Sequence, residues 1–406
     1  MVHTDRVSAL QNPGRLPMVT TPAESATWTV NARARGAVAA INLDALRANV
    51  GRCREVASGA DVMAIVKADA YGHGLVPCAV AARDAGATWL GVALLDEALA
   101  LRSAGVGGRV LAWLGSPGAR WAECIDNDID ISVSARWSLD AVAAAAKSAG
   151  RRARVHLKVD TGLSRGGGTI ADWSELAQAA HALQSLGLVE VVGLWSHFAN
   201  ADRPAEPSNA SQTAAFDSAV DYARGVGLEP EVLHMANSAA TFVLPQSRYN
   251  LVRPGIAIYG LSPGEEIGTS ADLGLTPVMS LRALLASVKQ VPAGVGVSYG
   301  YEYVTREPTS VGLIPMGYAD GLPRAAVNAG PVLAAGRLRT IAGRVSMDQV
   351  VVDLGSDPAS PGDEVVLFGV DGPTADDWAA ACGTIAYEIV TRIGPRVPRA
   401  YLGADR

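Results

Sequence analysis

Polar side chains that can move protons follow several apolar runs of this sequence. Lys67 ends one run, Lys158 and Asp160 lie at the end of another, and His197 and His234 close two more. A lysine held against an apolar surface has a lowered pKa and becomes a nucleophile for a carbonyl group. A lysine at a strand end also commonly extends its amine into solvent. The residue types alone leave both interpretations open.

The runs that end in these residues alternate with helical patterns from about residue 36 onward. Short apolar runs separated by Ala-rich amphipathic stretches are typical of a parallel α/β sheet that is covered on both faces. Eight such units in roughly 200 residues predict a (β/α)8 TIM barrel, whose active site lies at the carboxyl ends of the strands. The eight predicted strands are residues 62–67, 88–93, 109–114, 129–133, 153–159, 190–196, 231–235 and 255–259.

An open doubly wound sheet is the alternative for this rhythm. That fold needs a G-x-G-x-x-G turn after its first strand, because the glycines let the backbone approach a phosphate. Residues 67–74, Lys-Ala-Asp-Ala-Tyr-Gly-His-Gly, lack this spacing. The barrel is therefore preferred.

The pattern changes after about residue 276. Short strand-like runs punctuated by Gly and Pro predict a mainly antiparallel β domain that closes with a helical piece at 375–393. The predicted strands of this domain are 280–288, 311–315, 350–354 and 364–368. The expected organisation is a disordered tail at 1–35, a barrel at 36–273 and a C-terminal β domain at 274–406.

Composition excludes several classes of protein. The 406 residues are 49% hydrophobic and 18% charged, with a formal charge of -6. This composition does not fit a disordered chain, and the acidic balance disfavours a nucleic acid partner. Apolar stretches are too short to form a membrane-spanning helix. The four cysteines include no C-x-x-C pair, which favours a reduced, cytoplasmic protein without a metal site.

The segment around Lys67 resembles the pyridoxal phosphate (PLP) lysine segment of alanine racemases. It reads Ala-Ile-Val-Lys-Ala-Asp-Ala-Tyr-Gly-His-Gly over residues 64–74. The resemblance continues in order from about residue 36 to the end of the chain. It implies a PLP-binding barrel followed by a β domain, and an enzyme that interconverts L- and D-alanine and supplies D-alanine for peptidoglycan. The further matching segments are 158–165, 195–199, 234–240, 253–260, 296–300, 317–321 and 343–348.

The resemblance implies two catalytic bases. Lys67 would carry PLP on its amine and act as one base, while Tyr299 would act as the second. In the family this tyrosine comes from the partner subunit of a homodimer. His197 matches the residue that interacts with it, and a tyrosine of ordinary pKa, about 10, needs such help at neutral pH. Without this context Tyr299 would be interpreted as a packed aromatic of a β strand.

The resemblance also implies a set of cofactor contacts. Arg253 matches the arginine at the pyridine nitrogen, where a group that keeps its proton leaves that nitrogen unprotonated. The neutral contacts would be Tyr71, His197, Asn237, Ser238, the backbone amides of Gly255 and Ile256, and Tyr387. Ser238 could equally cap a short helix that begins near Asn237.

Arg165 and the backbone N–H of Met347 match the groups that receive the substrate carboxylate. Lys158, which is carbamylated in many family members, would orient Arg165. His234, Tyr318 and Asp348 would support the site. The run Gly166-Gly-Gly168 is more flexible than the usual family segment.

Three other functions remain as alternatives. A barrel-type PLP decarboxylase would place a carboxylate near the pyridine nitrogen and a cysteine near the substrate, whereas this chain has Arg253 and no Cys within 299–348. A non-enzymatic PLP carrier would end with the barrel. A serine or broad-specificity racemase differs only in how residues such as Tyr318 and Tyr387 shape the substrate pocket.

Overall fold

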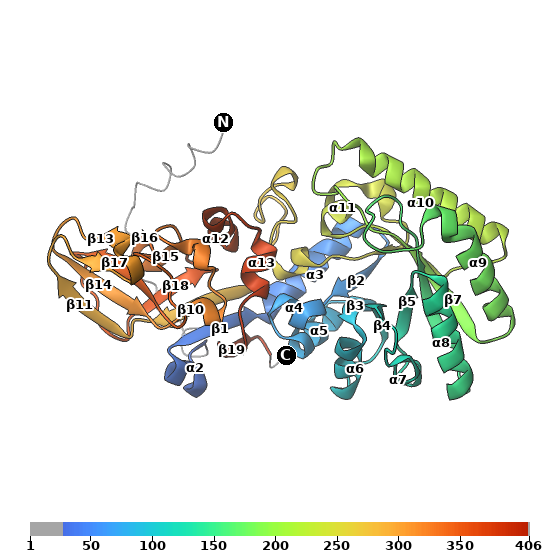
Figure 1. The fold of residues 1–406 in the computed structure, drawn as a ribbon, viewed down its shortest axis with the longest axis horizontal. Helices are drawn as coiled ribbons and strands as arrows, with labels where there is room; N and C mark the ends of the chain where they lie inside the picture. Colours follow the sequence, from blue (N-terminus) through green and yellow to red (C-terminus); the bar gives the residue numbers. More distant parts are fainter. Residues whose placement is uncertain (1–26, 405–406) are drawn as a thin grey trace. The chain divides into compact units, whose positions relative to one another are not determined.

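A computed structural model describes residues 27–404 of the chain (Figure 1). These residues form two compact units. One unit spans Leu43–Thr276, and the other combines the described residues up to Asn42 with Pro277 and the residues after it. Among residues 27–404, no helix is long and apolar enough to cross a membrane.

The first unit is a nearly closed parallel barrel, as predicted. Its sheet order is β8-β7-β6-β5-β4-β3-β2-β9. Strands β8 and β9 are the two ends of this order. They are linked by the Arg253 N–H, directly after β9, which donates to the Ala236 carbonyl, just after β8, at 2.9 Å. The open sheet is thereby excluded. The strands are β2 (Asp61–Ile65), β3 (Trp89–Leu94), β4 (Arg109–Leu114), β5 (Asp130–Val133), β6 (Ala153–Lys158), β7 (Val189–Trp195), β8 (Val232–His234) and β9 (Leu251–Val252).

Helices follow the barrel strands and cover their outer side (Figure 1). In α8 the buried residues Leu139, Val142, Ala143 and Ala146 recur at the spacing of one helix face, which explains why this stretch packs against the strands. The helices are α3 (Leu43–Ala57), α4 (Lys67–Tyr71), α5 (Leu75–Asp84), α6 (Leu95–Ser103), α7 (Trp121–Asp126), α8 (Arg136–Ala149), α9 (Ile170–Ser185), α10 (Pro207–Gly225) and α11 (Ser238–Val243), with short 3-10 turns η2 (Pro245–Ser247), η3 (Ile256–Tyr259) and η4 (Glu265–Ile267).

The eighth strand lies earlier in the chain than predicted. Residues 255–259 form the 3-10 turn η3, and β9 at Leu251–Val252 pairs with β2 instead. Pro254 separates the two pieces, and a proline has no N–H with which to continue a sheet ladder. The apolar character of 255–259 therefore reflects burial in a turn rather than a strand.

The second unit is mainly antiparallel, as predicted. A six-stranded sheet has the order β16-β15-β18-β10-β1-β19, a three-stranded sheet has the order β11-β14-β17, and β12 pairs with β13. The pairing of β1 with β19 is parallel. The strands are β1 (Ala37–Asn42), β10 (Met279–Leu284), β11 (Ser287–Val291), β12 (Gly296–Val297), β13 (Tyr303–Val304), β14 (Thr309–Ile314), β15 (Pro331–Ala334), β16 (Arg337–Thr340), β17 (Val350–Gly355), β18 (Glu364–Phe368) and β19 (Arg399–Leu402).

Two predicted elements of this unit are each split in the structure. The run 280–288 forms β10 and β11, and the helical piece 375–393 forms α12 (Ala375–Cys382) and α13 (Ala386–Thr391). Gly383 separates these helices in the left-handed conformation, with φ 67°, which a glycine adopts without steric cost. Three 3-10 turns, η5 (Tyr299–Tyr301), η6 (Tyr318–Asp320) and η7 (Arg324–Ala326), complete the unit.

The domain boundaries differ from the expected ones because the first described residues belong to the second unit. Strand β1 pairs antiparallel with β10, and Figure 1 shows these blue and orange strands side by side. The expected tail at 1–35 is ordered from residue 27: helix α2 (Val30–Arg35) precedes β1 and is capped by the Thr29 side chain. Residues 1–26, which carry the rest of that prediction, lie outside the described part of the chain.

Candidate functional site

Lys67 follows the first barrel strand through an unusual turn. Strand β2 ends at Ile65, and Lys67 begins α4, so the lysine does not end the strand itself. Residues 68–71 all have left-handed backbone angles, with φ of 53–54°. None of them is glycine, and a left-handed residue of this kind costs roughly 1–2 kcal/mol. Strain of this size persists only where the surroundings hold it, and it concentrates at functional sites.

Two carboxylates hold this turn. Glu97 accepts a hydrogen bond from the Ala68 N–H at 2.5 Å, while its other oxygen accepts from the N–H groups of Ala93 and Leu94 at the end of β3. Asp69 accepts from the Leu75 N–H at 2.7 Å. The turn is therefore fixed to the neighbouring strand β3 and to α5, and these contacts hold the backbone next to Lys67 in position.

The surroundings of the Lys67 amine lower its pKa. Burial lowers the pKa of Lys67, and the positive charges of Arg165 and Arg253 lower it further, against an opposing effect of Glu97. The amine lies 5.8 Å from the ring centres of both Tyr71 and Trp113. A larger share of Lys67 is therefore a neutral nucleophile near pH 7 than of an exposed lysine.

Arg253 lies directly after β9 and is 5% exposed. One of its nitrogens donates to the carbonyls of Ser196 and Met235 and contacts His197 Nδ1 at 3.2 Å. The other contacts His234 Nδ1, also at 3.2 Å. Burial lowers the pKa of Arg253 to about 9, which still leaves the guanidinium charged at neutral pH.

These contacts assign the proton positions of a buried chain of histidines. A guanidinium only donates, so His234 Nδ1 must accept and its proton must be on Nε2. His234 Nε2 lies 2.9 Å from His156 Nδ1, and His156 Nε2 lies 3.3 Å from Asp130 Oδ2. His156 therefore receives from His234 and donates to Asp130. Burial and the charge of Arg253 lower the pKa of His234 well below its ordinary value, which is consistent with the neutral form.

Asp130 ends this chain as a wholly buried carboxylate. Burial on its own would raise its pKa, but the hydrogen bond from His156 and the charges of Arg154 and Arg109 outweigh that effect and hold the pKa below its ordinary value. Gly193 makes the arrangement possible, because a Cβ at that position would lie 2.3 Å from His156 Nδ1.

Neutral donors gather at the carboxyl ends of β8 and β9. The Ser238 hydroxyl accepts from the Gly255 N–H at 2.8 Å, and burial raises the pKa of Tyr71, which therefore stays a phenol. Ile256 is buried beside them. Asn237, rather than Ser238, caps α11 by accepting from the Ala240 N–H at 3.0 Å. The Ser238 side chain is thus directed to the Gly255 turn.

Two positively charged residues, Lys158 at the end of β6 and Arg165 in the segment that follows it, lie near the end of β7, where Trp195 is found. The Lys158 amine lies 4.5 Å from the Trp195 ring centre, and burial together with Arg253 and Arg165 lowers its pKa to about 8. Within residues 27–404, no hydrogen bond or ion pair engages the exposed Arg165 guanidinium. A guanidinium in this state is suited to a carboxylate ligand.

The glycine run after Arg165 is held in place by backbone pairing. The Gly168 N–H donates to the Lys158 carbonyl, and the Asp160 N–H donates to the Gly168 carbonyl. Gly167 has φ 129°, and a Cβ there would lie 2.6 Å from the Asp160 nitrogen. This run therefore contacts the backbone of β6 closely, which explains why glycine occurs where flexibility was expected.

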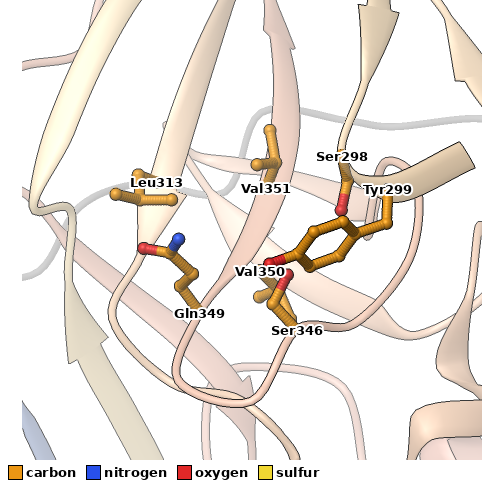
Figure 2. Close-up of a pocket in the computed structure, with 7 residues that line it drawn as sticks. All are labelled: Ser298, Tyr299, Leu313, Ser346, Gln349, Val350 and Val351. Atoms are coloured by element: carbon orange, nitrogen blue, oxygen red, sulfur yellow. The ribbon is translucent and has the colours of Figure 1, made fainter. Parts of the chain in front are cut away.

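The remaining predicted residues lie in the second unit. Tyr299 is 70% exposed and Met347 is 53% exposed. Tyr318 belongs to η6, Tyr387 is half-buried on α13, and Asp348 is exposed and pairs with Arg396. Figure 2 shows the Tyr299 ring at a pocket that it lines with Ser298, Leu313, Ser346, Gln349, Val350 and Val351. A tyrosine and a methionine so exposed in one unit are available to another surface.

Several residues of the site were not predicted from the sequence. Glu97, Asp130 and His156 lie inside helical or apolar patterns, and their contacts join different strands. The only sequence signal for them was a charged or polar residue in a buried run, at Asp130 and His156. Such residues are costly to bury unless they are paired, so they indicate partners without identifying them.

Comparison with known proteins gives one family along the chain. The alanine racemase N-terminal domain family matches residues 41–263, and the alanine racemase C-terminal domain family matches residues 278–401. The alanine racemase of Streptomyces coelicolor is 56% identical over 391 residues, which cover 94% of this chain and 99% of that protein.

Solved structures give the same result. The alanine racemase of Streptomyces lavendulae has a TM-score of 0.90 and 57% identity, covering 90% of this chain and 97% of that one. The Bacillus anthracis alanine racemase, solved with bound L-Ala-P, has a TM-score of 0.83 and 35% identity, covering 91% of this chain and 95% of that one.

Proposed function

This chain belongs to the alanine racemase family, and we propose that it interconverts L- and D-alanine with PLP as cofactor and with Lys67 and Tyr299 as the two bases. The observation that supports this most strongly is Lys67 itself. A half-buried lysine of lowered pKa follows the first barrel strand, on a left-handed turn that two carboxylates hold. The same group can therefore anchor a carbonyl cofactor and take up a proton.

The residues present fit PLP. Ser238, the Gly255 turn and Tyr71 offer neutral donors at the carboxyl ends of the strands, where they would bind a phosphate without a cation. A Cβ on Gly255 would lie 2.4 Å from the Tyr71 hydroxyl, so only a glycine lets that phenol come this close to the turn. We infer that Asn237, Ile256 and Tyr387 complete the set. When bound, PLP withdraws the electron pair that remains on the α-carbon after its proton leaves.

Arg253 would contact the pyridine nitrogen. Its guanidinium keeps its proton at neutral pH, so it leaves that nitrogen unprotonated. His197 and His234 accept from Arg253 and add no positive charge, because burial and Arg253 lower the pKa of both. This environment favours return of a proton to the α-carbon over other fates of the substrate. A decarboxylase would instead need a carboxylate here.

The substrate carboxylate would be received by Arg165 and by the Met347 N–H. Arg165 has no internal partner in the described residues, which leaves its donors for the substrate. Lys158, with a pKa of about 8, has a neutral fraction that can take up carbon dioxide as a carbamate. An anion at that place would attract Arg165, whereas the bare ammonium repels it.

Tyr299 would act from the partner subunit of a homodimer. Its exposure, with that of Tyr301, Tyr318 and Met347, supports an assembly that covers this surface. We further propose a cytoplasmic enzyme that supplies D-alanine for peptidoglycan. The four cysteines are all free thiols, as expected in a reducing compartment.

The decisive experiment combines cofactor mapping with a substrate panel. We expect the purified protein to be yellow. Borohydride reduction should then fix the cofactor on Lys67, and peptide mapping would locate it. Recovery of the label on another lysine would refute the assignment of Lys67. Racemisation of a panel of L-amino acids then tests the substrate. Faster turnover of L-serine than of L-alanine would refute alanine as the preferred substrate.

A further inference from the structure

The start of the described chain is built into the second unit. Helix α2 is capped at Thr29 and ends at Gly36, whose left-handed φ of 69° turns the chain into β1. Trp28, Ala32, Val38 and Ala400 form a small apolar cluster beneath the helix. Arg35 is the last residue of α2. The Thr29 cap holds one end of this helix, and the turn at Gly36 into β1 holds the other.

Arg35 contacts both ends of the loop at residues 315–320. One of its nitrogens donates to the Pro315 carbonyl at 2.7 Å, and another contacts Asp320 Oδ1 at 2.6 Å. Between these two contacts lie residues 316–319, which include Tyr318. Asp320 is wholly buried, and its second oxygen accepts from the Gly317 N–H at 3.0 Å. The loop thus closes on a carboxylate that Arg35 neutralises.

The same loop is hydrogen-bonded to the Met347 segment. The Tyr318 N–H donates to the Ser346 carbonyl at 3.0 Å, and the Ala319 N–H donates to the Met347 carbonyl at 2.9 Å. Gly317 has no room for a side chain, because a Cβ would lie 2.3 Å from the Ser346 and Met347 carbonyl oxygens. The Tyr318 loop and the Met347 segment are therefore held against each other.

A second arginine extends the same arrangement. Arg396 Nε lies 3.3 Å from Asp320 Oδ1, and another of its nitrogens lies 2.7 Å from Asp348 Oδ1, one residue after Met347. Arg396 is 45% exposed, whereas Arg35 is 22% exposed. Arg35 is consequently the better shielded partner of the buried carboxylate.

We propose that Arg35 is a positioning residue for substrate binding: by holding Pro315 and Asp320, it keeps the Tyr318 loop and the Met347 N–H in the geometry that receives the substrate. This inference rests on the proposed function for the roles of Tyr318 and Met347. The contacts of Arg35 with Pro315 and Asp320 do not depend on that function, and their effect on the loop can be measured independently of activity.

The test compares Arg35→Gln and Arg35→Lys with the matched control Arg339→Gln. Arg339 is also a partly buried arginine of this unit, and it pairs with Asp357 and donates to the Asp353 carbonyl rather than to the loop. All three variants are assayed as holoenzymes for the KM and kcat of L-alanine. Amide hydrogen exchange is measured over residues 315–321 and 346–348.

We expect Arg35→Gln to raise KM about tenfold, because a displaced Met347 N–H makes a weaker hydrogen bond to the charged substrate carboxylate, and a tenfold change corresponds to about 1.4 kcal/mol. The kcat should change less, and exchange should quicken in both segments. Arg35→Lys should lie between wild type and Arg35→Gln, because a lysine keeps the charge without the two-pronged contact. Arg339→Gln should leave KM and both segments unchanged.

Two results would overturn the proposal. One is unchanged KM and unchanged exchange in Arg35→Gln, or in Arg35→Lys if Arg35→Gln does not fold. The other is an equal effect of Arg339→Gln, which would reduce Arg35 to a general structural contact. If the wild-type protein does not racemise alanine, the proposed function fails, and the exchange data still decide whether Arg35 holds the loop.

Discussion

Replacing Asp130 by asparagine tests the buried chain that ends at Arg253. The Asp130 carboxylate accepts from Arg154 Nε at 2.6 Å, lies 3.3 Å from His156 Nε2 and lies 3.8 Å from an Arg109 nitrogen. An asparagine keeps the shape and one accepting oxygen, and it removes the charge. Arg154 and Arg109 then lose their common partner, and the proton of His156 loses a charged acceptor.

The expected loss follows from the burial of this carboxylate. Removing one member of a buried ion pair typically costs about 3–5 kcal/mol. Arg154 and Arg109 are 23% and 30% exposed, so water partly compensates them, and we expect a loss near the lower end, about 3 kcal/mol. For a unit of this size, that loss lowers the unfolding midpoint by about 6–12 °C.

Asp128→Asn is the matched control. Asp128 also faces Arg154, but it is 61% exposed and pairs with Arg151 at 2.7 Å. Exposed pairs of this kind contribute about 0–1 kcal/mol. Asparagine also tolerates the positive φ of 52° at this position. The control should therefore shift the midpoint by a small fraction of the Asp130 effect.

Calorimetric unfolding of the three holoenzymes at several pH values is the assay. The lowered pKa of Asp130 means that its stabilisation is present above the unfolded value near 3.9 and is lost as pH falls through the folded value. The difference between wild type and Asp130→Asn should thus be constant from pH 7 to 5.5 and shrink below about pH 4. Equal midpoints for Asp130→Asn and Asp128→Asn would refute the argument.

Three further predictions concern the proposed site. Tyr299→Phe should slow α-deuterium exchange from L-alanine by about 10²–10⁴-fold and slow it less from D-alanine; equal losses would favour a single base. Mixing inactive Lys67→Ala and Tyr299→Phe chains should restore activity through hybrid dimers, and continued inactivity after verified exchange would count against a shared site. Because the pKa values of His197 and His234 are lowered, stability is full above pH 6.5 and declines below it, by about 1.4 kcal/mol for each histidine at pH 5.5. A flat stability profile from pH 8 to 5.5, measured by denaturant unfolding, would contradict the last prediction.

The order of barrel elements was predictable because each depends on local periodicity. Seven of the eight predicted strands occur within a few residues of their expected positions, from β2 at Asp61–Ile65 to β8 at Val232–His234. The exception, 255–259, follows the Arg-Pro pair at 253–254. An apolar run carries no information on whether its N–H groups find a neighbouring strand, and here the proline interrupts the ladder.

The site was predicted in a similar, partial way. The motifs gave Lys67, Arg253, Ser238 and Arg165 as candidates, and the structure brings Lys67 and Arg253 close enough for their charges to interact. It also corrects the role of Ser238, whose capping function belongs to Asn237. A hydroxyl beside an asparagine satisfies the capping pattern in either register, so only the backbone geometry distinguishes the two.

Residue types and their spacing were sufficient for the class of fold and for the proposal of Lys67 as the cofactor lysine. These features are encoded locally, by the alternation of strands and helices and by short motifs. The tertiary structure decided that β1 pairs with β10, that Arg35 closes the loop of Tyr318, and that His234 and His156 connect Arg253 to Asp130. Each of these contacts joins residues far apart in the chain. Burying their charged and hydrogen-bonding groups costs free energy unless the groups are paired, and they find their partners only when the chain is folded.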